Sequence, residues 1–170
     1  MSKFSNKRKE SFLDSIPTES LDNKTNDIVC RCKFNFSYFD NSQGVGQDFK
    51  DWTQEELAKL LDKLKNYCKF PLEHWKNEKI GSGKHRNGIL VEYGSFPVKT
   101  DFKFPLHIPH QVIWGRFRLE QATRLIGFTI PKQYEDLFCN NKKLKYRFDC
   151  NTFYVVFLDK NHRFWKSSNK

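Results

Sequence analysis

The sequence predicts an α+β domain in which a small, mainly antiparallel sheet is backed by one or two N-terminal helices. Residues 28–39 alternate between apolar and polar side chains, which is the period-two pattern of a half-buried strand. Residues 53–68 carry leucines at helical spacing along one face. Three later segments are rich in β-branched and aromatic residues and are predicted to be strands: 111–120, 124–130 and 152–158.

The composition changes after the first 26 residues. Residues 1–26 are mostly Lys, Ser, Asn, Asp and Glu, and such a segment buries too little surface to offset the entropy of ordering. We therefore expect a tail over 1–26 that is disordered or is ordered by a partner, followed by a single α+β domain over 27–170. The 17 Phe, 6 Tyr and 4 Trp of the chain predict an aromatic core for that domain.

The protein is expected to be cytoplasmic and to have no membrane partner. No run approaches the ~20 apolar residues of a transmembrane helix, and the N-terminus lacks the apolar region of a signal peptide. The five cysteines are odd in number and scattered, which fits reduced thiols. Cys30 and Cys32 fall on one face of a predicted strand, so we interpret them as core residues rather than half of a zinc site.

The strongest predicted helix begins after Thr53. Thr53 and Glu56 have the spacing of a capping box, and the helix is expected to end by Phe70 because Pro71 disfavours helical backbone in the residue before it. A second, short helix is predicted over 72–76. Both helices are expected to cover the sheet, and we assign no chemistry to them.

Two loops follow the helices. Residues 81–88 are basic and glycine-rich but lack the ending of a phosphate-binding loop, so an exposed hairpin loop is expected, with backbone contacts to phosphate as the alternative. Residues 89–93 are strand-like, and 96–109 are expected to be irregular because they contain three prolines. His107 and His110 have a spacing that can ligate a metal, but no third ligand accompanies them. We therefore predict no metal site and no cofactor.

The C-terminal third contains a predicted hairpin of strands 111–120 and 124–130. Alternation along the first strand places Trp114, Arg116 and Arg118 on one face. A face that carries arginines beside a tryptophan is not simply core. The remaining expected elements are a short helix within 131–138, a polar loop over 140–143, a short strand over 146–148 and the buried strand 152–158.

Positive charge is concentrated in this same third of the chain. The net charge is +10, and residues 111–170 contribute +7 of it, with 12 basic and 5 acidic side chains. Such an excess attracts phosphate backbones without sequence specificity. RNA is therefore the first candidate partner, and a basic surface without a partner is the alternative.

The order of these elements resembles the RelE/ParE toxin superfamily. Arg116-Phe117-Arg118 is similar to the basic first strand of that family's hairpin, and Arg124-Leu125-Ile126 is similar to the opening of its second strand. The stretch from Phe157 to Trp165 is similar to the last strand and its His-Arg-aromatic ending. The specific part of the resemblance covers residues 111–165, and Trp165 stands near a position where the family has Tyr or His.

The resemblance implies a toxin of a toxin–antitoxin system, acting as a metal-independent endoribonuclease on mRNA, including ribosome-bound mRNA. It also implies a cognate antitoxin protein that covers the basic face. Relatives of the ParE type bind a protein target instead of cutting RNA. A non-catalytic RNA-binding or protein-interaction module that uses the same basic face is therefore the alternative, and the sequence leaves the choice open.

Cleavage of RNA by attack of a 2′-OH on the adjacent phosphate needs proton transfer and cations. His162 has an ordinary pKa that suits proton transfer near neutrality, and Arg124 and Arg163 would stabilise the phosphate. A turn in which His162 bonds to Asp159 is the structural alternative. Five further residues are predicted to contact RNA, the tryptophans by stacking on bases: Arg116, Arg118, Trp114, Trp165 and Lys160.

Overall fold

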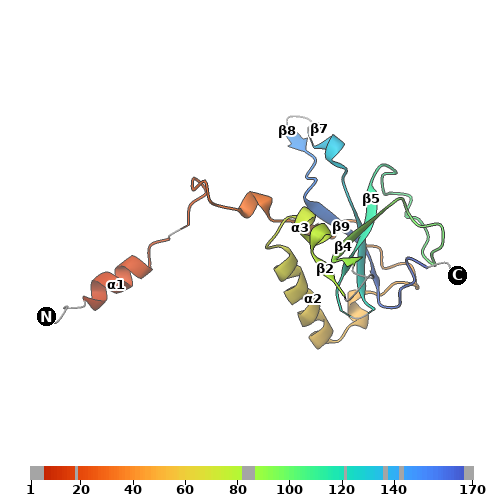
Figure 1. Ribbon diagram of the computed structural model, residues 1–170, viewed down its shortest axis with the longest axis horizontal. Helices are drawn as coiled ribbons and strands as arrows, with labels where there is room; N and C mark the ends of the chain where they lie inside the picture. The colour runs from red at the N-terminus through yellow and green to blue at the C-terminus, as the bar shows by residue number, and fades with distance from the viewer. Residues whose placement is uncertain are drawn as a thin grey trace.

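A five-stranded sheet forms the centre of the protein. The computed structural model describes residues 6–17, 19–81, 87–120, 122–135, 138–141 and 144–166. The strands lie in the order β1-β9-β6-β5-β4, and β1 is parallel to β9 whereas the other neighbours are antiparallel (Figure 1). The predicted α+β class with a mainly antiparallel sheet is thus confirmed. The strand bounds are β1 Lys33–Asn35, β4 Leu90–Gly94, β5 Ile113–Arg118, β6 Arg124–Thr129 and β9 Thr152–Asp159.

Two helices cover one face of the sheet. Helix α2 spans Gln54–Tyr67 and helix α3 spans Leu72–Asn77. The predicted capping box is present at the start of α2, where the Thr53 hydroxyl accepts from the Glu56 amide and the Glu56 carboxylate accepts from the Thr53 amide. The helices bury apolar side chains against the sheet, and this helix-side core includes Leu60, Leu64, Tyr67, Leu72, Trp75, Phe117, Leu125, Phe153, Val155 and Leu158.

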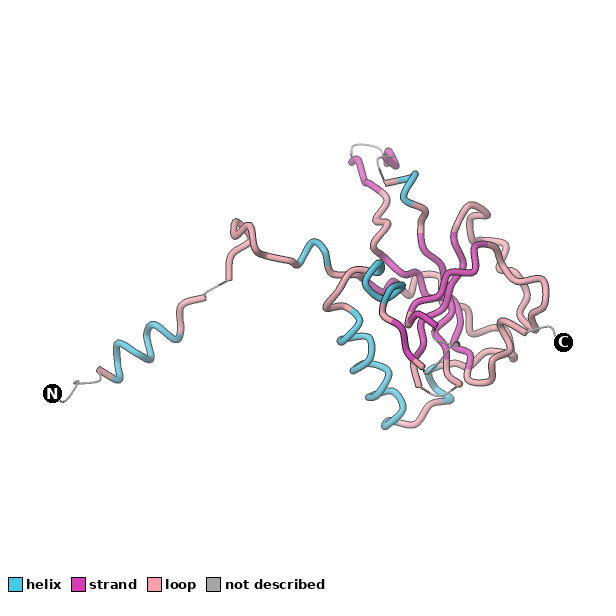
Figure 2. The backbone as a smooth tube through the Cα atoms, viewed as in Figure 1, coloured by secondary structure: helices cyan, strands magenta, loops and turns pink. Residues whose placement is uncertain are grey.

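Irregular chain covers much of the other face. The segment between β4 and β5 contains the three predicted prolines and no regular element, as expected, yet it buries Phe102 and Ile108. Together with Phe164 after β9, these residues close a second core over the sheet. Figure 2 shows the loop segments that lie beside the strands. The rest of this loop-side core comes mainly from the strands, including Trp114, Ile126, Phe128, Val156 and Phe157.

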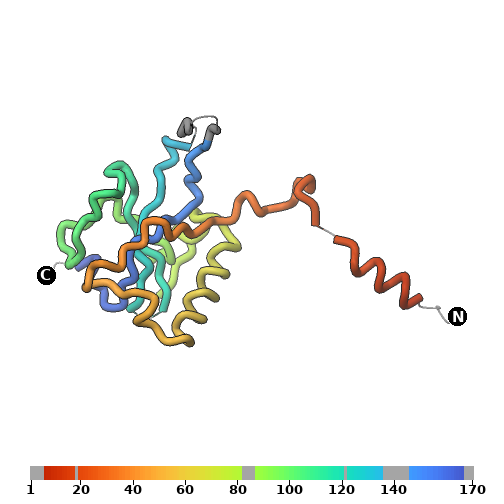
Figure 3. The backbone as a smooth tube through the Cα atoms, turned by 180° about the vertical axis from the view of Figure 1, so that it is seen from behind, coloured from red at the N-terminus to blue at the C-terminus, as the bar shows by residue number. Residues whose placement is uncertain are grey.

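The remaining elements are small. Helix α1, Lys7–Asp14, buries none of its residues and lies apart from the sheet (Figure 3). Strands β2 Lys79–Ile80 and β3 Asn87–Gly88 form one hairpin, whose loop at 82–86 lies outside the described residues. A second hairpin joins β7 Phe138–Asn141 to β8 Leu144–Arg147, so a strand occupies part of the expected polar loop. Short 3₁₀ turns among the residues that the structure describes are Ile28–Cys30, Phe49–Asp51 and Lys132–Tyr134. No helix among the described residues is long and apolar enough to cross a membrane.

The prediction of a long strand over 28–39 is wrong outside Lys33–Asn35. Cys30 lies exposed in a 3₁₀ turn, and its carbonyl accepts from the Asn151 side chain instead of from a strand. The strand ends where the Asn35 side chain accepts from the Ser37 amide and turns the chain. Apolar and polar residues continue to alternate in the sequence through these turns. The strand is short because only Lys33–Asn35 pair with β9.

Candidate functional site

Three arginines project from the face of the sheet opposite the helices. Arg118 on β5 pairs directly with Arg124 on β6, and Arg116 points the same way because it lies two residues before Arg118. Phe117 and Leu125 alternate with them and pack into the helix-side core. We call Arg116, Arg118 and Arg124 the arginine cluster.

The positive charges of the arginine cluster are only partly balanced by protein groups. Only 6% of the Arg124 surface is exposed, and burial together with the charges of Arg116 and Arg118 lowers its pKa to about 10. Tyr93 and Asp159 act in the opposite direction, but more weakly. In the described part of the chain, no carboxylate forms an ion pair with Arg116 or Arg118. Concentrated like charge with perturbed pKa values is typical of functional sites.

One nitrogen of Arg116 is buried without a hydrogen-bond acceptor. Nη1 of Arg116 is shielded from solvent, and no described group accepts its hydrogen. The guanidinium lies beside the Tyr93 hydroxyl, and its charge partly offsets the burial that raises the pKa of Tyr93. An unpaired buried donor costs about 1–3 kcal/mol, so most such donors in proteins have a partner. An oxygen atom of a bound ligand would satisfy this one.

His162 contacts the arginine cluster. Its Nε2 atom lies 3.3 Å from Nη2 of Arg124. A guanidinium can only donate, so Nε2 is the acceptor and the ring proton of a neutral His162 is on Nδ1. Burial and the positive charge of Arg124 lower the pKa of His162, and Asp159 counteracts them only in part. The imidazole is therefore neutral at pH 7, and the residue is exposed to solvent.

The turn that presents His162 is organised by Asp159. The buried Asp159 carboxylate accepts from the backbone amides of Asn161, Arg163 and Phe164, at 2.9 to 3.1 Å. His162 has a φ of 54°, a left-handed conformation that is uncommon for a residue other than glycine. The hydrogen bonds of Asp159 hold it there. The alternative in which His162 itself bonds to Asp159 does not occur in this turn.

An aromatic stack lies beside Arg116. The rings of Tyr93 and Trp165 stack with centroids 4.4 Å apart and an interplanar angle of 15°. Trp165 is 47% exposed. Proteins that bind single-stranded nucleic acid combine such exposed aromatic rings, on which the bases stack, with nearby cationic groups. Stacking of Trp165 on an RNA base stays a prediction, and the exposed position of the ring is compatible with it.

The prediction that Trp114 stacks on a base is wrong. Trp114 is 2% exposed and packs in the loop-side core, with ring contacts to Phe96, Phe128 and Phe164. It shares the face of Arg116, as predicted, but the segment between β4 and β5 covers this end of the face. The arginine cluster occupies the other end of the face, where Arg116 and Arg118 are half-buried and Arg124 is buried.

Lys160 also lies away from the arginine cluster. Its Nζ atom is 2.8 Å from a carboxylate oxygen of Glu56 on α2 and 4.5 Å from the centroid of the Trp52 ring. The cause is a bulge where β6 meets β9, at which the register shifts between Ile126 and Gly127. The shift places Asp159 opposite Arg124, so the next residue, Lys160, points to the helix side.

Arg163 follows His162 and is exposed, and its backbone holds the turn through bonds to Asp159 and to the Asp101 amide.

Sequence reasoning missed Tyr93 and did not assign Asp159 a role in the site. The Asp-Lys-Asn-His sequence after β9 is a turn signal that points to Asp159. No comparable sequence signal points to Tyr93. It lies on β4 and reaches Arg116 only because β4 pairs with β5 in the sheet.

The described residues contain no group of three or more His, Cys, Asp or Glu side chains that could hold a metal ion. His107, one member of the His-x-x-His pair, stacks on Tyr38 with ring centroids 5.8 Å apart. The chemistry that the arrangement around the arginine cluster offers is therefore anion binding by guanidinium groups and proton transfer by one imidazole.

Comparisons of the chain with protein-family models, with curated proteins and with solved structures found no match. The assignment of a function rests on the geometry of the site.

Proposed function

We propose that the protein binds single-stranded RNA at the arginine cluster and cleaves it without a metal ion. The observation that carries this proposal is the contact between neutral His162 and Arg124, within a group of three arginines on one face. The group combines the two functions that phosphodiester cleavage requires, namely proton transfer and charge stabilisation.

Phosphate binding is supported by the donors that the site offers. Guanidinium groups donate in a planar fork that matches two oxygens of one phosphate. The buried Nη1 atom of Arg116 has no acceptor among the described residues, and a phosphate oxygen would supply one. A polyanion would also relieve the mutual repulsion that lowers the pKa of Arg124.

RNA is favoured over DNA because RNA carries its own nucleophile. The 2′-OH can attack the adjacent phosphate once a base removes its proton, so a site of imidazole and guanidinium groups is sufficient. In the proposal, Nε2 of His162 exchanges its bond to Arg124 for a bond to the 2′-OH and takes its proton. The 2′-oxygen bonds to phosphorus and the P–O5′ bond breaks, which leaves a 2′,3′-cyclic phosphate, and the departing 5′-oxygen takes a proton from water. Arg124 and the neighbouring Arg163 then stabilise the charge on the pentacoordinate phosphate. Arg124 remains cationic at neutral pH, so it acts by charge and not as a proton donor.

The resemblance of residues 111–165 to RelE/ParE toxins extends this proposal to the cell. The substrate is then mRNA, including ribosome-bound mRNA, and an antitoxin protein with an acidic or amphipathic segment covers the arginine cluster. Expression of the protein alone would arrest growth, and co-expression of such a partner would restore it. A gene for an antitoxin beside this one would support the assignment.

The test compares two histidine variants. His162→Gln should lower the rate of cleavage of a labelled single-stranded RNA by ~10²–10⁴ while the affinity changes only a few-fold. His110→Gln is the matched control, because His110 is also an exposed histidine and lies in the proline-rich loop. EDTA should leave the wild-type rate unchanged. Cleavage that persists in His162→Gln and is lost with EDTA would contradict the proposal.

A second candidate is an RNA-binding module without catalysis. It is favoured by one observation, namely that the nitrogen needed as the base already accepts a hydrogen bond from Arg124. In that case Arg124 and His162 form a fixed pair that shapes the surface. Tight binding of RNA that stays intact in the presence of the wild-type protein would select this candidate.

A further inference from the structure

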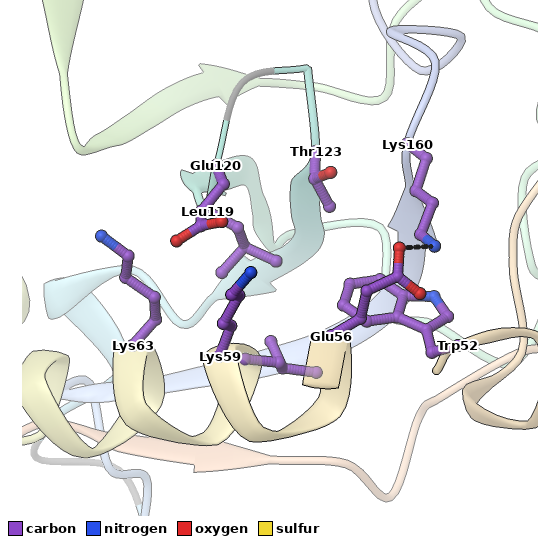
Figure 4. Close-up of a pocket in the computed structure, with 9 residues that line it drawn as sticks. Trp52, Glu56, Lys59, Lys63, Leu119, Glu120, Thr123 and Lys160 are labelled. Atoms are coloured by element: carbon purple, nitrogen blue, oxygen red, sulfur yellow. Dashed lines mark hydrogen bonds and ion pairs between the residues drawn. The ribbon is translucent and has the colours of Figure 1, made fainter. Parts of the chain in front are cut away.

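A cavity of about 220 Å³ lies between α2, the β5–β6 hairpin and the end of β9 (Figure 4). Lys59 and Lys63 rise from α2 toward the hairpin, and Lys160 enters from the opposite wall. Ligand pockets for drug-sized molecules span roughly 300–1,000 Å³, so this cavity suits a single chemical group of a longer ligand. It is lined by Trp52, Glu56, Lys59, Leu60, Lys63, Leu119, Glu120, Thr123 and Lys160.

Trp52, one of the residues that line the cavity, has a donor without an acceptor. Nε1 of Trp52 is buried, and no described group accepts its hydrogen. The ammonium group of Lys160 lies over the same ring, 4.5 Å from its centroid, and is held by an ion pair with Glu56. The indole N–H can only donate, so the group that satisfies it must bring an acceptor such as an anionic or carbonyl oxygen.

The charged side chains that line the cavity have a net charge of +1. Three lysines and two glutamates line it, and two of the lysines are paired, Lys160 with Glu56 and Lys59 with Glu55 on the outside of α2. Among the described residues neither Lys63 nor Glu120 has an ion-pair partner. Lys63 is therefore the lining cation that can contact an anionic group, and Glu120 limits how much negative charge the cavity accepts.

The cavity adjoins the arginine cluster. Thr123 lines it, and the Thr123 carbonyl accepts from Nη1 of Arg124 at 2.8 Å. The end of the β5–β6 hairpin at Thr123 therefore lies between the arginine cluster on one face of the sheet and the cavity on the helix side.

We propose that this cavity binds a second phosphate group of the same RNA strand, an inference that rests on the proposed function. Lys63 contacts the phosphate, and the Trp52 indole donates to one of its oxygens. Lys160 stays paired with Glu56 and forms the wall. The RNA then follows a bent path around the hairpin tip, and a substrate too short to reach the cavity binds only the arginine cluster.

The experiment measures the affinity of oligouridylates of about two and about ten nucleotides as a function of salt, because single-strand site sizes of ~4–16 nucleotides are common. For the longer probe, Lys63→Gln should reduce the slope of log affinity against log salt by about 0.7, the value for one phosphate contact to single-stranded nucleic acid. For the shorter probe it should change nothing. Trp52→Phe retains the ring but removes the N–H, and should weaken only the longer probe, by about fivefold.

Lys65→Gln is the matched control, because Lys65 is an exposed lysine two residues further along α2 and points to a different side. If Lys63→Gln and Lys65→Gln behave alike on the longer probe, the cavity lies outside the RNA path and the inference is wrong, whereas the proposed function stands. Equal weakening of both probes by Lys63→Gln would also overturn it. If neither probe binds the wild-type protein, the proposed function itself fails.

Discussion

Replacing Arg124 with methionine is expected to make the protein more stable and its binding to RNA weaker. The change in the Arg124 pKa from 12.5 to about 10 means that the folded protein disfavours the charge. At about 1.4 kcal/mol for each tenfold change in proton affinity, this amounts to about 3 kcal/mol. Little of it is screened by solvent, because Arg124 is only 6% exposed.

The substitution also removes favourable contacts. Arg124 donates to the Thr123 carbonyl at 2.8 Å and to His162 at 3.3 Å, and each bond contributes about 1 kcal/mol net. Methionine is flexible and fills much of the space of the arginine stem, so the cavity left behind is small. The balance predicts that Arg124→Met raises the free energy of unfolding by about 1 kcal/mol.

Urea unfolding at neutral pH measures this change, and RNA affinity is measured on the same samples. Arg31→Met is the control, because Arg31 is exposed and forms a surface ion pair with Asp27 at 2.8 Å. Its effect should stay within about 0.5 kcal/mol. If Arg124→Met lowered stability by more than about 1 kcal/mol, the arginine would be a structural residue. The arginine cluster would then serve the fold and not a ligand.

Three further outcomes are expected. Charge reversal of Arg116 and Arg118 should reduce the slope of log RNA affinity against log salt concentration by at least about 0.7 for each lost phosphate contact, whereas charge reversal of Lys65 should have little effect. If both changes had equal effects, RNA would not bind at the arginine cluster. The rate of cleavage should increase as the pH rises through the pKa of His162. Burial and the charge of Arg124 lower that pKa, so the acid limb of the pH–rate profile should lie below pH 6.5. An acid limb above pH 6.5 would contradict the contact between His162 and Arg124. Trp114→Ala should destabilise the protein by about 3–5 kcal/mol in urea unfolding, because the ring is buried; a change below about 1 kcal/mol would contradict its place in the core.

The protonation of His162 also affects stability. Because its pKa in the folded protein lies below the ordinary value of 6.5, the unfolded chain binds a proton more readily than the folded one. The contribution of neutral His162 to stability is therefore complete above pH 6.5 and decreases as the pH falls toward the folded pKa. His162→Gln should flatten this part of the stability curve.

Local patterns predicted the elements whose residues interact mainly with near neighbours in sequence. The capping box placed the start of α2 correctly, because both of its hydrogen bonds lie within four residues. The hairpin of β5 and β6 was predicted for the same reason, and with it the common face of Arg116 and Arg118. The register of the hairpin, seen only in the structure, adds Arg124 to that face. Alternation alone was misleading at 28–39, where the partner strand pairs with only three residues.

Contacts between distant segments decided the rest of the site. Trp114 was predicted to face the arginine side, and it does, but the pattern along β5 contains no information about which loop covers that end of the strand. The Tyr93–Trp165 stack and the cavity beside α2 each join segments that are far apart in the chain. No spacing within either segment predicts these contacts.

The amino-acid sequence by itself determined that β9 is a buried strand, that a turn follows it and that cations are concentrated around it. It did not determine which side of the sheet each residue of β9 faces, because residues 152–158 are almost entirely apolar and show no alternation. A bulge of β9 at Val156, opposite the step from Ile126 to Gly127, decided this. A Cβ atom at Gly127 would lie only 2.0 Å from the Tyr154 carbonyl oxygen, so glycine permits the close approach of the two strands there. The one-residue shift places both Val156 and Phe157 in the loop-side core, turns Asp159 toward Arg124 and sends Lys160 to α2, because a shift of one residue exchanges the two faces of a strand.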